Sequence, residues 1–191
     1  MVTIQKPSKD AIQRFLQKQA NTGFSYPQVH FTEKEEAVPG YNNDHNRVLL
    51  GKGQAVYDAA CEALRHWQMF PGDWAWVEPP SAPIQTGQTL AMVTKVFGLH
   101  WLNGCRIVYT LDGTGPERRF GFAYGTLPEH IECGEERFSV EWRADDTVWY
   151  DLKAFSHPRL WLVWLAYPVA RYLQRRFVRE SLQRMKSKIE N

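Results

Sequence analysis

The sequence predicts an α+β protein in which one face of an antiparallel sheet is covered by a long C-terminal helix. Two observations lead to this prediction. Strand-like segments follow one another between residues 74 and 155, and the separators between them carry Gly, Asn or Asp. After them, residues 160–189 read as one helix, which is the only long element left to cover the sheet. A length of 191 residues suits one domain, or one domain with an appendage.

The first element is expected to be a helix over residues 8–20. Ser8 is a suitable N-cap, and apolar residues follow at helical spacing. Residues 24–36 show no clear period, and residues 39–44, with the sequence Pro-Gly-Tyr-Asn-Asn-Asp, have the composition of a turn. We therefore expect an N-terminal helical appendage over residues 1–37 and a main domain over residues 38–191.

The main domain is expected to begin with a helix over residues 53–67, because its apolar residues fall on one stripe. A short strand over residues 74–77 should follow. Five longer strands are then predicted at residues 88–97, 104–111, 118–126, 137–142 and 148–155. Pro168 interrupts the final helix, so a kink is expected near it.

Composition excludes several classes of protein. The chain is 43% hydrophobic and 23% charged, which is typical of a globular protein rather than a disordered one. A net charge of +2 gives no reason to expect a nucleic-acid partner. The three cysteines are odd in number and lack CxxC spacing, which indicates free thiols in a reducing compartment, so we expect a cytoplasmic protein. The N-terminus lacks the apolar stretch of a signal peptide, and the apolar run 160–170 is shorter than the roughly 20 residues of a membrane-spanning helix.

The strand around residue 138 places a carboxylate on a face that is otherwise apolar. By alternation, one face carries Glu136, Phe138, Val140 and Trp142, which we interpret as core. The other face, with residues 135, 137, 139, 141 and 143, is expected to meet solvent. A buried carboxylate is unfavourable unless it is paired or reaches water in a cavity. Glu136 therefore either lies at the strand edge in water or belongs to a cavity.

The preceding strand repeats this pattern and adds a hydroxyl group. Phe122 and Tyr124 share one face, while small residues at positions 121, 123 and 125 allow close approach on the other. Tyr124 either satisfies its hydroxyl within the protein or contacts a ligand. Arg106 on the strand before could pair with a carboxylate such as Glu136, most simply as a structural ion pair.

No motif identifies a reaction. The six histidines show no metal-binding spacing, and neither a phosphate-binding loop nor a GxSxG motif occurs, so we expect no metal and no cofactor. His130 follows Pro128-Glu129 in a predicted loop and is either solvated or functional.

The final helix carries an excess of positive charge. Residues 171–188 hold seven basic residues and one acid, Glu180, whereas the rest of the chain has 16 basic and 20 acidic residues. This face is either a solvated side of a helix packed on the sheet or a surface for an anionic membrane. Nucleic acid is the less favoured anionic partner.

Several blocks of the sequence resemble one family. They include Gly121–His130 (GFAYGTLPEH), Gly134–Glu141 (GEERFSVE), Ala154–Pro158 (AFSHP), Pro39-Gly40-Tyr41, Leu50-Gly51-x-Gly53, the Ala60–Trp67 stretch and Arg171-x-x-Gln174-x-x-Phe177. The pattern, over residues 39–177, resembles the family known as domain of unknown function 1990, of the UPF0548 type. His157 stands where that family has Arg, so no role that needs a permanent charge is carried over there.

The resemblance extends to the Bet v 1-like superfamily, which includes START-like and polyketide-cyclase-like proteins. It implies a helix-grip fold, in which a curved antiparallel sheet wraps around a long C-terminal helix and leaves a cavity between them. Proteins of this kind commonly hold lipids, sterols, hormones or polyketides.

Three functional hypotheses follow from the residues and the resemblance. The first is the binding of a hydrophobic small molecule, lipid-like or polyketide-like, in a cavity lined by Arg106, Phe122, Tyr124, Glu136, Phe138, Val140 and Trp142. The second is an enzyme that acts on such a molecule with Glu136 or His130 as general acid or base. The third is a peripheral membrane or partner-docking protein that uses Trp161, Trp164, Tyr167 and the basic helix. The sequence leaves open whether a reaction is catalysed, and it does not indicate an oligomeric state.

Overall fold

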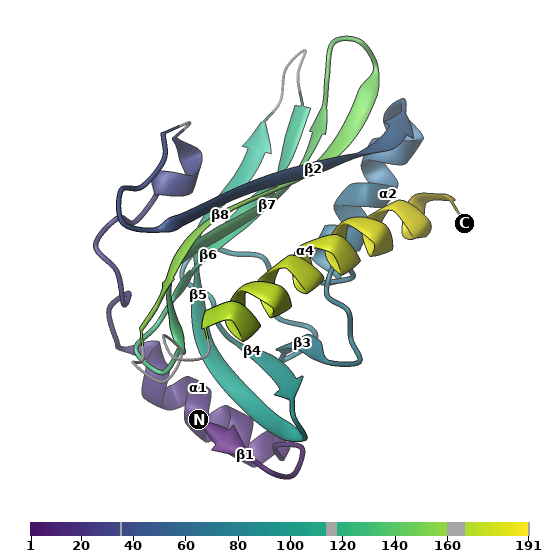
Figure 1. Ribbon diagram of the computed structural model, residues 1–191. Helices are drawn as coiled ribbons and strands as arrows, with labels where there is room; N and C mark the ends of the chain where they lie inside the picture. The colour runs from purple at the N-terminus through teal and green to yellow at the C-terminus, as the bar shows by residue number, and fades with distance from the viewer. Residues whose placement is uncertain (35, 114–117, 160–166, 191) are drawn as a thin grey trace.

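One strongly curved antiparallel sheet organises the computed structural model (Figure 1). The structure describes residues 1–34, 36–113, 118–159 and 167–190. Within them the strand order is β2-β8-β7-β6-β5-β4-β3, and β1 pairs with β5 outside this path. The strands are β1 Val2–Thr3, β2 Asn42–Lys52, β3 Ala75–Glu78, β4 Thr89–Val96, β5 Leu99–Gly113, β6 Arg118–Thr126, β7 Glu132–Trp142 and β8 Thr147–Pro158.

Two helices, α2 (Gln54–Arg65) and α4 (Tyr167–Glu190), lie on the concave side of the sheet (Figure 1). Leu64 of α2 and Met185 of α4 are fully buried against the aromatic side chains of the central strands. The Tyr150 hydroxyl on β8 shares a 2.8 Å hydrogen bond with Ser181 Oγ on α4, which fixes the helix across the sheet. The arrangement is the expected helix-grip fold.

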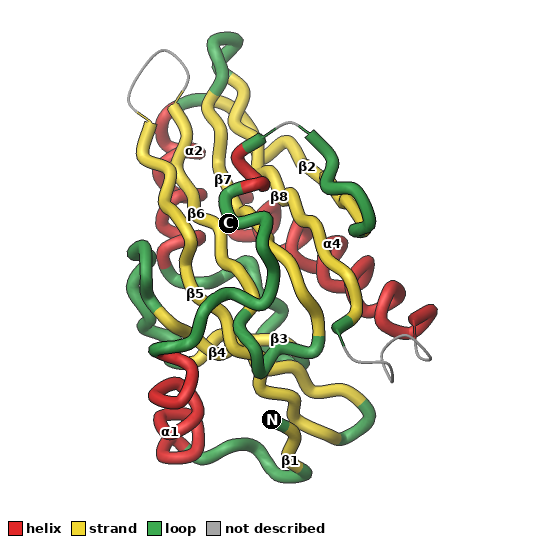
Figure 2. The backbone as a smooth tube through the Cα atoms, turned by 90° about the vertical axis from the view of Figure 1, so that its left-hand side faces the viewer, coloured by secondary structure: helices red, strands yellow, loops and turns green. Residues whose placement is uncertain are grey.

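The N-terminal residues cover the convex side of the sheet (Figure 2). Helix α1 (Lys9–Ala20) begins at the predicted N-cap, where Ser8 Oγ accepts a hydrogen bond from the Ala11 N–H. Its Ile12 and Phe15 side chains are buried against Ala91, Val93 and Leu102 of β4 and β5. After α1, the chain runs over the sheet through the short 3₁₀ helix η1 (Phe31–Glu33) to β2.

The expectation that the outer face of β7 meets solvent was wrong for residues 135, 137 and 139. Glu135 and Arg137 are each 2% exposed, and Ser139 is fully buried. The reason is the N-terminal segment. Glu135 accepts a hydrogen bond from the Tyr26 hydroxyl at 2.8 Å, and Arg137 donates one to the Thr32 carbonyl at 2.9 Å.

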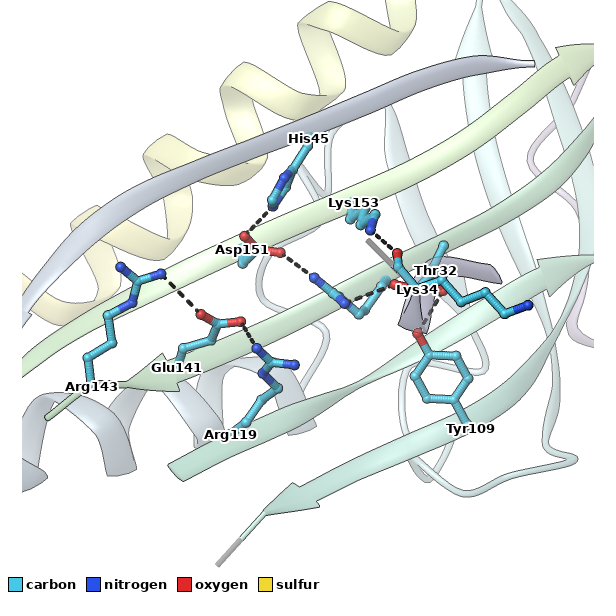
Figure 3. A network of polar contacts seen from close by, with 10 residues as sticks. Thr32, Lys34, His45, Tyr109, Arg119, Glu141, Arg143, Asp151 and Lys153 are labelled. Atoms are coloured by element: carbon cyan, nitrogen blue, oxygen red, sulfur yellow. Dashed lines mark hydrogen bonds and ion pairs between the residues drawn. The ribbon is translucent and has the colours of Figure 1, made fainter. Parts of the chain in front are cut away.

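A polar network continues from this contact across the outer face (Figure 3). Arg137 forms an ion pair of 2.9 Å with Asp151, and both side chains are 3% exposed. Asp151 also contacts His45 Nε2 at 2.6 Å, while Thr32 shares a 2.7 Å hydrogen bond with the Tyr109 hydroxyl. The network connects η1 to β2, β5, β7 and β8.

Most predicted elements are present, and two strands were missed. Helix α2 and strands β3 to β8 match the predicted segments, although β5 and β7 begin five residues earlier than predicted. Strand β2 was not predicted because Asn42, Asn43 and Asp44 are typical of turns; pairing with β8 holds them extended. Strand β1 has only two residues and gives no periodic signal.

The final helix is described from Tyr167 onward, so the apolar run 160–166 lies outside the described residues. Pro168 is the second residue of the described helix, and the residues with which a preceding turn would be formed lie outside the described ranges. The predicted kink is therefore not tested by the described residues. No helix in the described ranges is long and apolar enough to cross a membrane. All three cysteines are buried free thiols, as predicted.

Candidate functional site

A cavity of about 310 Å³ lies between the concave face of the sheet and the N-terminal half of α4. Its walls are mostly apolar. The helix contributes Val169, Ala170, Leu173 and Phe177, and the sheet contributes side chains from β2 and from β4 to β8. Phe97 and Val169, which are 85% and 40% exposed, line it as well, so the cavity reaches the protein surface.

A row of paired residues brings two polar groups together in this cavity. In the strand register, Tyr124 on β6 pairs with Glu136 on β7, and Glu136 pairs with Ala154 on β8. Ala154 in turn pairs with Asp44 on β2. The Tyr124 hydroxyl donates a 2.6 Å hydrogen bond to Glu136 Oε2. The small Ala154 side chain leaves space between the carboxylates of Glu136 and Asp44.

Helix α4 adds a second set of polar contacts. The Arg171 guanidinium donates two hydrogen bonds to the Asp44 carboxylate, at 2.7 and 2.9 Å. Gln174 Nε2, one turn further along, donates to Glu132 Oε1 at 2.6 Å and to Ser156 Oγ at 3.1 Å. These contacts hold the helix against the concave face of the sheet. They also place a third carboxylate, that of Glu132, beside the cavity.

Burial perturbs the carboxyl groups of the cavity. It raises the pKa of Glu136 to about 7; the Tyr124 hydrogen bond partly opposes this shift, while the nearby Glu132 and Asp44 carboxylates reinforce it. Burial also raises the pKa of Glu132, against the hydrogen bond from Gln174. The cavity therefore holds a carboxyl group that changes charge near neutral pH.

His130 lines the same cavity but is a poor candidate for acid catalysis. It is 6% exposed, and burial lowers its pKa to about 3, so the imidazole is neutral at pH 7. Its Nδ1 accepts a 3.0 Å hydrogen bond from the Glu132 N–H. One ring nitrogen is thus already engaged by the backbone, and the imidazole stabilises the turn before β7.

The structure brings Tyr124 and Glu136 together in the cavity and places the other predicted site residues elsewhere. Phe122, Phe138, Val140 and Trp142 lie on the same concave face but pack in the core. The Phe122 ring lies 4.9 Å from Trp67, and the Trp142 ring 5.7 Å from Tyr57 of α2. Helix α2 and the residues after it fill this end of the concave face, so these four side chains pack against them.

Arg106 lies on the convex side, so its expected pairing with Glu136 was wrong. Its guanidinium donates to the carbonyl oxygens of Gln19, Ala20 and Thr22, each at 2.8 Å. It therefore caps the C-terminal end of α1, which is a favourable place for a cation. In the strand register Arg106 pairs with Gly125 and Ile107 pairs with Tyr124, so Arg106 lies on the face opposite to Tyr124 and Glu136.

The polar residues of the cavity that sequence reasoning missed include Asp44, Asn103, Glu132 and Gln174. Asp44 was hidden in an unpredicted strand, and Glu132 lay before the predicted start of β7. For Gln174, the sequence signal was the Arg171-x-x-Gln174 pattern, which is one of the blocks that resemble the family. Trp161 and Trp164, proposed for membrane contact, lie outside the described residues.

The curved sheet wraps around helix α4, and a cavity that contains the Tyr124–Glu136 pair lies between them. This architecture defines a helix-grip protein. A structure of hypothetical protein jhp0584 from Helicobacter pylori shows the same fold, with 12% identity, a TM-score of 0.54 and coverage of 87% of this chain and 94% of that chain. The chain belongs to the family described as Domain of unknown function (DUF1990), whose model matches residues 25–184.

Relatives from two distant organisms support this assignment. A UPF0548 protein of Dictyostelium discoideum is 34% identical over 97% of this chain and 94% of its own length. A UPF0548 protein of Arabidopsis thaliana is 36% identical over 74% of this chain and 70% of its own length. Their names state no activity, so a function has to be argued from the site.

Proposed function

We propose that the protein binds a hydrophobic small molecule in the cavity beneath α4, with the polar end of the molecule at Tyr124 and Glu136. The observation that carries the proposal is a mostly apolar cavity of about 310 Å³ with a carboxyl group, that of Glu136, for which the described part of the chain offers no basic partner. Small-molecule sites are typically apolar cavities of about 300–1,000 Å³ with a few placed polar groups.

The position of the polar pair supports binding rather than a purely structural role. Burying a carboxyl group is unfavourable in free energy, and an ion pair or several hydrogen bonds usually offset this penalty. Within the described residues Glu136 has one hydrogen bond, from Tyr124, and no ion pair. A bound molecule would supply the missing contacts.

A cavity-filling variant tests the proposal. The probe is N-phenyl-1-naphthylamine, an uncharged fluorophore whose emission rises in apolar surroundings. Ala170→Trp places an indole in the cavity from α4, and Ala154→Phe fills it from β8. Gln183→Trp adds the same indole on the exposed side of α4 and serves as the control.

We expect the wild-type protein and Gln183→Trp to bind the probe and both cavity variants to lose binding while keeping the wild-type circular dichroism spectrum. Equal probe binding by all four proteins would place the site elsewhere and overturn the proposal. Native mass spectrometry of protein purified from its own host would then reveal whether a natural ligand of defined mass accompanies the chain.

Proton transfer to or from a bound molecule is the second candidate function. It is favoured by the pKa of Glu136, about 7, because an acid or base is most effective when its pKa lies near the working pH. Glu136 would exchange the proton and Tyr124 would orient its carboxyl group. A carboxyl ¹³C titration of Glu136 with a midpoint near 4.5 would eliminate this candidate.

A further inference from the structure

The charged groups of the cavity are unbalanced, because carboxylates outnumber cations among the described residues. Three carboxylates, Asp44, Glu132 and Glu136, line it, and one guanidinium, Arg171, faces them. Arg171 directs its two terminal nitrogens, Nη1 and Nη2, to Asp44 at 2.7 and 2.9 Å, and Nη1 also to Gln174 Oε1 at 2.6 Å. Among the described residues Arg171 forms its ion pair with Asp44, whereas Glu132 and Glu136 have none. The Arg171 charge still acts on Glu132, whose pKa it lowers against the larger effect of burial.

Two neutral donors of the cavity are also engaged. The Tyr124 hydroxyl donates to Glu136 at 2.6 Å. The Gln174 amide donates to Glu132 at 2.6 Å and to Ser156 Oγ at 3.1 Å. These donors give Glu132 and Glu136 one side-chain hydrogen bond each, although a carboxylate can accept several.

Asn103 on β5 supplies another acceptor in the cavity that lacks a donor among the described residues. Its side chain is 1% exposed and lines the cavity. Its Nδ2 donates to the carbonyl oxygens of Met92 and Trp101, both at 3.3 Å, which fixes the orientation of the amide. Its Oδ1 has no hydrogen-bond partner among the described residues. A buried acceptor of this kind is unfavourable unless a donor reaches it.

We infer that the ligand of this cavity is a hydrophobic amine, whose protonated nitrogen lies beside Glu136 and Glu132. The inference rests on the proposed function and adds the chemical class of the ligand. An ammonium group has donors and no acceptors, so it complements a site in which the unfilled positions are acceptors. A fatty acid or another anion would meet three carboxylates and a single, already engaged, guanidinium.

Binding of an amine is then coupled to the ionisation of Glu136. The titratable and charged groups around it are Tyr124 on β6, Cys105 on β5, Tyr150 on β8, Glu132 on β7, Asp44 on β2, Arg171 on α4 and His130 before β7. Because the pKa of Glu136 is about 7, its carboxylate is present at pH 8 and largely protonated at pH 5.5. The preference for an amine should therefore decrease as the pH falls.

Three competitors with the same ten-carbon chain test the inference. Decylamine, decanol and decanoate are each used to displace N-phenyl-1-naphthylamine at pH 8 and at pH 5.5. We expect decylamine to bind about tenfold or more tightly than decanol at pH 8, as for a hydrogen bond to a charged partner, and decanoate to bind most weakly. At pH 5.5 the advantage of decylamine over decanol should shrink.

The variant Glu136→Gln keeps the shape of the site and a hydrogen-bond acceptor for Tyr124 but removes the charge. It should lose most of the preference for decylamine over decanol. Glu62→Gln removes an exposed carboxylate of α2, outside the cavity, and should keep the preference.

The outcomes separate the two proposals. If the fluorophore and decanol bind but decylamine has no advantage, or if Glu136→Gln keeps that advantage, the amine inference is overturned and the binding function stands. If neither the fluorophore nor any competitor binds, both proposals are overturned.

Discussion

Glu135 and Glu136 are neighbours in β7, yet their carboxylates lie on opposite faces of the sheet in opposite surroundings. Glu135 accepts hydrogen bonds from the Tyr26 hydroxyl at 2.8 Å and from the N–H groups of His30 and Thr32 at 2.9 and 3.0 Å. Glu136 accepts one, from a single tyrosine at 2.6 Å. The first carboxylate fastens the N-terminal segment to the sheet, and the second faces a cavity with most of its acceptor capacity unused.

Glu136→Gln should flatten the pH dependence of stability. Because the pKa of Glu136 is raised from the ordinary 4.5 to about 7, the folded state keeps a proton that the unfolded state releases between these values. The free energy of unfolding therefore falls as the pH rises through this window, by about 3 kcal/mol. Urea denaturation at pH 4.5 and pH 8 measures the effect.

We expect Glu136→Gln to be more stable than the wild type at pH 8, whereas Glu62→Gln should follow the wild-type profile. Parallel profiles for wild type and Glu136→Gln would contradict the assigned environment of Glu136.

Asp151→Asn should destabilise the protein strongly. The Arg137–Asp151 ion pair measures 2.9 Å and both side chains are 3% exposed, so the variant leaves a buried guanidinium without its counter-charge. The expected loss is about 3–5 kcal/mol in urea denaturation. The exposed Arg65–Glu62 pair provides the comparison, since Glu62→Gln should cost less than about 1 kcal/mol. Equal losses would show that the buried network contributes no more than a surface pair.

Gly121→Ala should lower the melting temperature, while Gly23→Ala should leave it nearly unchanged. A Cβ at position 121 would overlap the Phe138 carbonyl oxygen and Ser139 on the adjacent strand, whereas a Cβ at position 23 meets no atom within 4 Å. Overpacking of this kind typically costs about 1–3 kcal/mol. Thermal unfolding followed by circular dichroism compares the two variants, and similar melting temperatures would argue against the close approach of β6 and β7.

His130 should remain neutral well below the pH at which an ordinary histidine gains its second proton. Burial lowers its pKa to about 3, and its Nδ1 accepts the Glu132 N–H, so the expected form is the Nε2–H tautomer. Long-range ¹H–¹⁵N spectra of the imidazole groups between pH 8 and pH 5 report the tautomer directly. A doubly protonated His130 above pH 5 would disprove this assignment.

The helices and most strands could be predicted because their signals are local. Ser8 and the apolar spacing after it define α1, and alternation in β6 and β7 places Tyr124 and Glu136 on the concave face. Strand β2 could not be predicted, since its first residues favour turns and only the pairing with β8 makes them extended. Long-range pairing outweighed local preference there.

The extent of the cavity could not be derived from the strands alone. Phe138 and Glu136 are two residues apart on one face, but Phe138 packs in the core and Glu136 lines the cavity. The difference depends on where α2 ends along the concave face, which is a property of the whole fold. The burial of Arg137 was missed for a similar reason, because the segment that covers it has no periodic pattern.

The attachment of the N-terminal segment to β7 has a consequence for biosynthesis. Tyr26 and its partner Glu135 are separated by 109 residues, so the segment leaves the ribosome long before the strand that holds it. At about 5–20 residues per second, translation of the intervening chain takes about 5–20 s. During this interval the aromatic side chains that will cover the convex face have no sheet to pack on. The contact between Tyr26 and Glu135 can form only after β7 has been synthesised.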